Sequence, residues 1–255
     1  MRHTVDKAGK VLNLFSFQQP EWGVSEVAKV LELPKSTTSE IMSSLVDQQL
    51  LSRTGNGRYR LGWRLFELSQ VLLDNTKFCI EARRAMHELI ERWGETTHLA
   101  VLDGSQVLYV EKLQGTPAVQ ILLSRIGARL PAHCSGVGKV LLAFQEWNSV
   151  IHILEEQTLN AYTPNTITAF EKLAIELEQI RKQGYAYDSE EVVLGLCCVA
   201  APIYDLDRKV IAAISLSVPA YRFYPQQAHY TTIIVKTAQS ISKNIGFRKK
   251  VQPVL

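Results

Sequence analysis

Residues 24–65 read VSEVAKVLELPKSTTSEIMSSLVDQQLLSRTGNGRYRLGWRL, and this stretch decides the fold of the N-terminal part of the chain. Val27 and Leu31 lie at helical spacing, a polar turn ending at Pro34 follows, and a second apolar helical stripe begins at Ile41. Two short helices joined by a tight turn are typical of a helix-turn-helix, whose second helix enters the major groove of DNA.

A basic hairpin is predicted after these helices. Two strand-like runs flank a turn at residues 54–57, and Arg53, Arg58 and Arg60 border it. Because strand side chains repeat every second residue, Arg58 and Arg60 are expected to share one face. A helix at residues 5–17 and a loop at 18–23 are expected to precede the two helices. The segment as a whole predicts a winged helix-turn-helix that binds DNA.

The starts of the two helices carry capping signals. Ser25 is expected to cap the first helix. In the second, Thr37 followed by Glu40 matches a capping box, and Ser36 is the alternative cap. Short hydroxyl side chains at the start of a recognition helix also reach phosphates and base edges. The candidate DNA-binding residues are Lys35, Ser36, Thr37, Thr38, Ser39, Arg53, Arg58 and Arg60.

The distribution of charge supports a DNA-binding segment at the N-terminus. The 255-residue chain carries a net charge of +3. Residues 1–64 hold nine basic and six acidic side chains, whereas residues 65–255 hold nineteen of each. The whole excess of positive charge therefore lies in the segment with the helix-turn-helix pattern, where phosphates would attract it.

Composition is that of a globular protein, with 46% hydrophobic and 21% charged residues. No run approaches the roughly 20 apolar residues of a membrane span, and residues 1–10 lack the apolar core of a signal peptide. The four cysteines form neither a metal-type CxxC pair nor a disulfide framework. We therefore expect a reduced, cytoplasmic protein without a metal or other cofactor and without a membrane partner.

The remainder of the chain is expected to form a linker helix and a separate α/β domain. Two strand-like runs flank Gly104-Ser105, and residues 197–204 and 210–218 are apolar and β-rich. A strand at 119–124 and helices at 81–93, 136–144 and 170–183 are also predicted. The predicted organisation is α+β: a winged helix-turn-helix at 1–64, a linker helix at 65–80, and at 81–255 a domain with a mostly antiparallel sheet.

Short motifs spread over residues 5–245 resemble those of the IclR family of bacterial transcription regulators. They are Leu33-Pro34-Lys35-Ser36-Thr37-Thr38, Ser44-Leu45, Gly57-Arg58-Tyr59-Arg60-Leu61-Gly62, Leu130-Pro131-Ala132-His133, Gly138-Lys139-Val140-Leu141-Leu142-Ala143, Gly184-Tyr185-Ala186-Tyr187-Asp188-Ser189-Glu190-Glu191 and Cys198-Val199-Ala200-Ala201-Pro202-Ile203. The resemblance implies a winged helix-turn-helix, a linker helix and a GAF/profilin-like effector domain. It also implies homodimers or tetramers on double-stranded DNA, and dimers match pseudo-palindromic operators.

A regulator of this kind needs an effector site coupled to DNA binding. Ser215 and Ser217 lie two apart on a predicted strand and point to one face, and the backbone N–H groups of Gly136 and Val137 begin a helix and suit a carboxylate. The resemblance implies that positions matching these residues, Asp188 and Cys198 line a pocket for small acids. The candidate effector-binding residues are Leu122, Gly136, Val137, Asp188, Cys198, Ser215 and Ser217.

Two positions depart from the pattern that the resemblance implies. Glu40 stands where many members carry Arg on the recognition helix, so the operator of a relative does not transfer to this chain. Val137 is larger than the residue often found at its position, which changes the expected size of the pocket.

Two other functions fit less of the sequence. One is a thiol hydrolase with Cys198 as nucleophile, His133 as base and Asp188 as the residue that orients it, but no oxyanion motif accompanies them, and His133 also suits a core hydrogen bond. The other is an architectural DNA-binding protein that responds to no ligand, but such a protein would have no evident function for the α/β domain. We therefore predict a sequence-specific regulator, not an enzyme, whose action on DNA is modulated by a small organic or aromatic acid.

Overall fold

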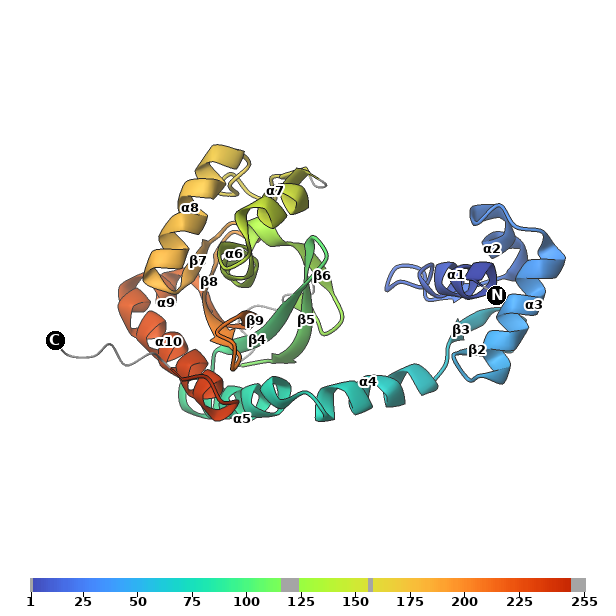
Figure 1. Cartoon of the computed structure of the whole chain (residues 1–255), viewed down its shortest axis with the longest axis horizontal. Coiled ribbons are helices and arrows are strands. Elements are labelled where there is room, and N and C mark those ends of the chain that lie inside the picture. The colour runs from blue at the N-terminus through green and yellow to red at the C-terminus, as the bar shows by residue number, and fades with distance from the viewer. Residues whose placement is uncertain (1, 116–123, 156–157, 249–255) are drawn as a thin grey trace. The chain divides into compact units, whose positions relative to one another are not determined.

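The structure, a computed structural model, describes residues 2–115, 124–155 and 158–248 (Figure 1). The chain divides into two compact units, Met1–Asn75 and Thr76–Leu255. Within the described ranges, no helix is long and apolar enough to cross a membrane.

The first unit is a winged helix-turn-helix, as predicted. Helices α1 (Arg2–Leu12), α2 (Val24–Val30) and α3 (Lys35–Asp47) pack together, with α1 and α2 both in contact with α3. A small antiparallel sheet of β1 (Glu21–Trp22), β3 (Tyr59–Leu61) and β2 (Leu51–Arg53), in that order, completes the unit. The buried apolar core consists of Val11, Val27, Ile41, Met42, Leu45, Leu51 and Tyr59.

Strand β1 was not predicted, because residues 18–23 contain Pro20 and Gly23 and suggest a loop. Its two residues pair with the central strand of the wing, Trp22 opposite Tyr59. The Trp22 indole N–H also donates to the Leu14 carbonyl over 3.0 Å. A strand of two residues is too short to show alternation, so only its pairing with β3 reveals it.

Both predicted helix caps are wrong. Helix α2 begins at Val24 with Gly23 as its N-cap, and the Glu26 carboxylate accepts from the Gly23 N–H over 2.9 Å, so Ser25 lies inside the helix. Helix α3 begins at Lys35 with Pro34 as its N-cap and without a side-chain cap. Proline fixes the backbone dihedral that a helix entry needs, which leaves the hydroxyl groups of the first turn uncommitted to capping.

Helices α4 (Arg64–Asp74) and α5 (Lys77–Trp93) replace the predicted linker helix at 65–80 and helix at 81–93. The break between them lies at Asn75 and Thr76, where the Asn75 side-chain amide donates back to the Val71 carbonyl over 2.7 Å. An apolar stripe runs through both helices, so periodicity alone did not locate the break.

The second unit is built on a six-stranded antiparallel sheet, which confirms the predicted sheet type. Strand order is β6-β5-β4-β9-β8-β7. The strands are β4 (Thr96–Asp103), β5 (Gln106–Leu113), β6 (Arg129–Pro131), β7 (Ala186–Ser189), β8 (Leu196–Tyr204) and β9 (Val210–Pro219). Sequence patterns predicted β4, β5, β8 and β9 but missed the shorter strands β6 and β7. The predicted strand at 119–124 lies outside the described residues apart from Ser124.

Helices cover both faces of this sheet (Figure 1). On one face, α6 (Gly136–Ala143) contacts β8 and β9, and α8 (Phe170–Gln183) packs on α6. On the other face, α5 contacts β4, and α10 (Gln227–Asn244) contacts β8. The remaining helices are α7 (Trp147–Glu155), the short α9 (Ala220–Phe223) and 3₁₀ turns at Ala132–Cys134 and Tyr224–Gln226.

Candidate DNA-binding surface and effector cavity

The start of α3 presents polar side chains to solvent. Lys35 and Ser36 are exposed, and Thr37 and Ser39 are half-buried. Thr38 differs, because its side chain is fully buried and its hydroxyl donates to the Pro34 carbonyl over 3.0 Å. A buried side chain offers DNA no surface, so Thr38 is withdrawn from the candidate DNA-binding residues and assigned to the core.

Arg58 is held within the protein. Its guanidinium donates to both Glu26 carboxylate oxygens, over 2.7 and 3.0 Å, and to the Glu21 carbonyl over 2.9 Å. The hydrogen bond from Arg58 lowers the pKa of the Glu26 carboxyl. A bidentate pair of this kind braces the wing against the start of α2.

The other two arginines of the wing are exposed. Arg53 lies over the Tyr59 ring, with its guanidinium carbon 5.3 Å from the ring centroid, and the Arg60 Nε donates to the Ser52 hydroxyl over 3.2 Å. These contacts orient the two side chains but leave their charge without a carboxylate partner among the described residues. Both are therefore suited to phosphate.

The second unit encloses a small cavity between α6 and the sheet. All the predicted effector-binding residues that the structure describes line it: Gly136, Val137, Asp188, Cys198, Ser215 and Ser217. Leu122 lies outside the described residues. The strand register explains the assembly, since Cys198 pairs with Ser217 on one side and Asp188 on the other, and His98 pairs with Ser215.

A chain of hydrogen bonds crosses the cavity wall. The Cys198 thiol lies 3.0 Å from the Ser217 hydroxyl, which lies 3.4 Å from His98 Nδ1, and His98 Nε2 lies 2.8 Å from the Ser124 hydroxyl. Burial lowers the pKa of His98 to about 3, so its imidazole is neutral, with one ring nitrogen donating and the other accepting. The wall therefore offers neutral donors and acceptors.

Asp188 is the acidic group of the cavity. Burial, with the negative charge of Glu191, raises the pKa of Asp188 to about 7. One of its carboxylate oxygens accepts from the Glu191 N–H over 2.7 Å. Asp188 therefore changes between a neutral donor and an anion near neutral pH.

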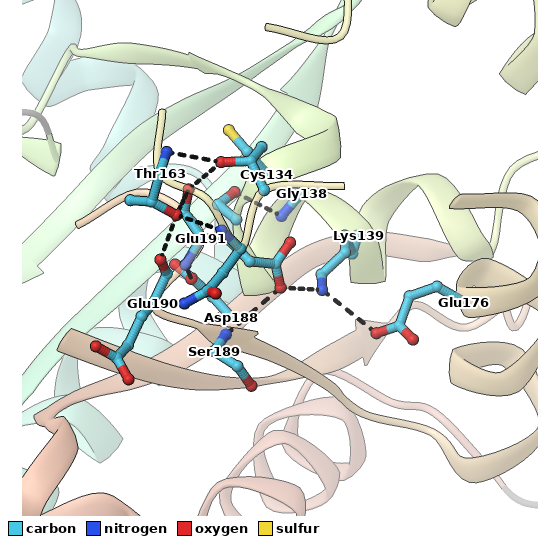
Figure 2. Close-up of polar contacts among 12 residues, drawn as sticks. Cys134, Gly138, Lys139, Thr163, Glu176, Asp188, Ser189, Glu190 and Glu191 are labelled. Carbon is cyan, nitrogen blue, oxygen red and sulfur yellow. Dashed lines mark hydrogen bonds and ion pairs between the residues drawn. The ribbon is translucent and has the colours of Figure 1, made fainter. Parts of the chain in front are cut away.

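A buried ion pair lies behind Asp188 (Figure 2). The Lys139 ammonium lies 2.5 Å from a Glu191 carboxylate oxygen and 3.3 Å from one of Glu176. Thr166 donates to the Glu191 carbonyl over 2.6 Å, and Thr163 to the Glu190 carbonyl over 2.7 Å. These contacts fix the turn at residues 190–195, whose Val192 and Val193 form part of the cavity wall.

The cavity is small in this conformation. Its volume is about 30 Å³, room for roughly two water molecules. The Val137 side chain lines it and is almost fully buried. An organic acid larger than two waters requires the wall to move outward.

Two family models match most of the chain between them. Residues 4–55 match the model described as "IclR helix-turn-helix domain", and residues 70–243 match "Bacterial transcriptional regulator IclR C-terminal". The chain belongs to the IclR family. It is an IclR-type DNA-binding transcription regulator with a C-terminal effector-binding domain, and its relatives are transcription regulators.

Similarity to individual IclR proteins extends over the whole chain. XynR of Escherichia coli (strain K12) is 35% identical over 246 residues, covering 96% of this chain and 97% of XynR. The IclR of Thermotoga maritima is 30% identical, with a TM-score of 0.74, covering 97% of this chain and all of that one. An IclR homologue from Microbacterium hydrocarbonoxydans, solved with 4-hydroxybenzoate, is 28% identical with a TM-score of 0.84, covering 95% and 98%.

Several cavity residues were missed by sequence reasoning. They are His98, Tyr109, Ser124, Leu130, Ser135, Val192, Val193 and Leu196. Tyr109 packs edge-on against His98, with centroids 5.3 Å apart, and Ser135, the N-cap of α6, lines the same cavity. A polar His98 inside the apolar β4 was the signal available. Placing His98 in the cavity from this signal would have required knowledge that β4 lies between β5 and β9.

Proposed function

We propose that this IclR-family regulator binds its operator through α3 and the wing, and that a small organic or aromatic acid bound in the cavity alters that binding. The observation that carries the proposal is the cavity itself, where the start of α6, Asp188 and the neutral chain from Cys198 to Ser124 face one space. Polar groups that converge in a cavity with apolar walls are typical of ligand sites.

An acid fits the cavity better than a cation or a neutral hydrocarbon. The N–H groups of Gly136 and Val137 lie at the start of α6, where the helix dipole favours negative charge. The Ser215 and Ser217 hydroxyls line the cavity and supply hydrogen bonds to carboxylate or hydroxyl oxygens. The relative solved with 4-hydroxybenzoate supports the same ligand class.

For DNA, we propose that Lys35, Ser36, Thr37 and Ser39 contact phosphates and base edges from the start of α3, while Arg53 and Arg60 contact phosphates from the wing. Their exposure and the free N–H groups of the first turn support these roles. Because its target is chromosomal DNA, the protein is proposed to act in the cytoplasm.

A homodimer, or a tetramer built from dimers, is proposed from the surface of α4. No residue of α4 is buried, and Leu68 and Val71, which lie three positions apart on one face of the helix, are 44% and 61% exposed. An exposed apolar helix face of this kind marks an interaction surface. A second copy is the occupant proposed, since a dimer matches two half-sites of an operator.

We propose no catalytic activity. His133, the base of the thiol-hydrolase alternative, has its Nε2 3.1 Å from the Asn160 carbonyl oxygen and does not line the cavity. Burial raises the pKa of the Cys198 thiol well above its ordinary value, which disfavours the thiolate that a nucleophile requires. These two observations support a binding role for Cys198.

Fluorescence anisotropy tests the DNA-binding proposal. Purified protein is titrated into labelled intergenic DNA from beside its own gene and into a shuffled duplex, across a series of salt concentrations. We expect preference for the native duplex at physiological salt. Equal and steeply salt-dependent binding to both duplexes would reduce the proposal to general phosphate attraction.

The effector proposal is tested on the same complex. Acetate, benzoate and 4-hydroxybenzoate are added as a size series, and we expect at least one to change the anisotropy of the bound operator. The Ser215→Ala/Ser217→Ala variant should lose this response with unchanged DNA affinity, while Ser240→Ala on the exposed side of α10 serves as the control. A normal response from the double variant would place the effector elsewhere.

A further inference from the structure

A wide groove opens between the C-terminal ends of α8 and α10 in the second unit. Its volume is about 780 Å³, in the range of small-molecule sites, and the C-terminal ends of α8, α10 and β8 form its walls. The groove and the effector cavity share none of the described lining residues. The groove lies beside the C-terminal end of β8, whereas the cavity lies beneath the start of α6, where Ala200 packs against Gly136.

The charged side chains that line the groove are all basic among the described residues. Its described lining includes four cations, Arg181, Lys182, Lys243 and Arg248, and neither Asp nor Glu. Arg181 donates to the carbonyls of Ala143, the last residue of α6, and of Gln145, and Lys182 pairs with Glu178 over 2.6 Å. Lys243 and Arg248 have no carboxylate partner among the described residues. Two unneutralised cations at one groove favour an anionic occupant.

An aromatic shelf lies beside these cations. Phe247 stacks on Tyr204, with centroids 5.1 Å apart and planes 27° from parallel. The turn that ends α10 holds Phe247 there, because Gly246 adopts a φ of 109° and the Phe247 N–H donates to the Ser242 carbonyl over 2.9 Å. The shelf is therefore built into the fold and does not depend on a flexible side chain.

We propose that this groove is a second ligand site, separate from the effector cavity, which binds a planar aromatic anion of up to mononucleotide size. The aromatic ring of the ligand packs on the shelf of Tyr204 and Phe247, and its anionic group lies between Lys243 and Arg248. Flat apolar surface next to unpaired cations matches this chemistry. Residues 249–255 begin with two lysines, so charge disfavours the C-terminal tail as the occupant.

The fluorescent anion 8-anilinonaphthalene-1-sulfonate is the probe for the test, because it carries a planar naphthalene ring and a sulfonate and is far larger than the 30 Å³ cavity. It is titrated into the full-length protein and into Lys243→Gln/Arg248→Gln. The matched control, Lys172→Gln/Lys236→Gln, removes the same charge from exposed positions of α8 and α10 outside the groove. Phe247→Leu removes half of the shelf, and thermal melting checks that each variant folds.

We expect the groove variant to bind the probe about tenfold more weakly than wild type and the control to bind within about twofold. Phe247→Leu should also weaken binding, and Ser215→Ala/Ser217→Ala should not. Equal loss in both charge variants would reduce the effect to general electrostatics, and no loss in either would place the probe on another apolar surface such as α4. A groove variant that changes the oligomeric state while retaining the probe would make the groove an interface. Each of these three outcomes overturns the proposal.

Discussion

Lys139 and Glu191 form a buried ion pair behind the effector cavity, with side-chain exposures of 2% and 6%. Lys139 lies one turn beyond the N–H groups of α6 that face the cavity, and the Glu191 N–H donates to Asp188 inside it. The pair thus joins the helix and the turn that form two walls of the cavity. A ligand that hydrogen-bonds to Asp188 therefore binds next to the backbone of Glu191, one member of this pair.

Removal of one partner of this pair is expected to be more damaging than removal of both. Lys139→Met should lower the free energy of unfolding by about 3–5 kcal/mol, because it leaves the Glu191 carboxylate buried without its cationic partner. Lys139→Met/Glu191→Leu should recover most of the loss. Urea unfolding followed by circular dichroism measures both. A double variant no more stable than the single one would show that the pair itself carries the stability.

Binding of a carboxylate effector should weaken as pH rises through neutrality. The pKa of Asp188 is about 7, so this group is mostly neutral at pH 6 and mostly anionic at pH 8, where it repels an acid. We expect about tenfold weaker binding of benzoate at pH 8 than at pH 6, measured by calorimetry. Asp188→Asn should bind benzoate almost independently of pH in this range. An equal pH dependence in that variant would assign the titration to another group.

His98 makes the folded protein sensitive to acid. Its pKa falls from 6.5 to about 3 on folding, so the unfolded chain binds a proton that the folded chain excludes as pH drops below 6.5. The contribution of His98 to stability is therefore complete above pH 6.5 and is lost toward pH 3, by up to about 1.4 kcal/mol per pH unit. Unfolding free energies at pH 7, 6 and 5 should fall less steeply in His98→Gln. Parallel curves for the two proteins would contradict this assignment.

The sequence predicted the parts of the site that depend on local pattern. Ser215 and Ser217 share a face because strand residues alternate, and the start of α6 at Gly136 follows from its helical pattern. Cys198 and Asp188 join them in the cavity because β7, β8 and β9 are neighbours. Here the resemblance to the IclR family supplied what periodicity alone does not.

Residues whose role depends on distant partners were missed. Nothing in the local sequence distinguishes Lys139 from the other residues of α6, and its burial is explained by its distant partners Glu176 and Glu191, 37 and 52 positions later. His98 enters the cavity because β4 pairs with β9, a contact across more than 100 residues. Thr38 was misassigned for the same reason, since burial of one hydroxyl in a helix start depends on tertiary packing. Strand order and packing are set by the whole chain and leave no local signal.

Arg58 and Arg60 should respond differently to substitution. Arg60→Ala is expected to weaken binding to operator and shuffled DNA alike and to reduce the salt slope of log K by about 1, because it removes a phosphate contact. Arg58→Ala removes the brace to Glu26 and should lower the melting temperature of the protein while leaving the salt slope unchanged. Anisotropy across a salt series and thermal melting distinguish the two. A reduced slope in Arg58→Ala would return Arg58 to the phosphate contacts.

The apolar face of α4 should control assembly. Leu68→Glu/Val71→Glu places two charges on that face, because the two residues lie three positions apart on the helix, and is expected to give monomers at concentrations where wild type sediments as a dimer or tetramer. Because a monomer holds only one half-site, its operator affinity should fall by a factor on the order of 100. Ser69→Glu/Gln70→Glu adds the same charge to polar positions of α4 and should leave assembly intact. If sedimentation velocity shows the same species for both variants, the interface lies on another surface, and the exposed side chains of α4 are free for another partner.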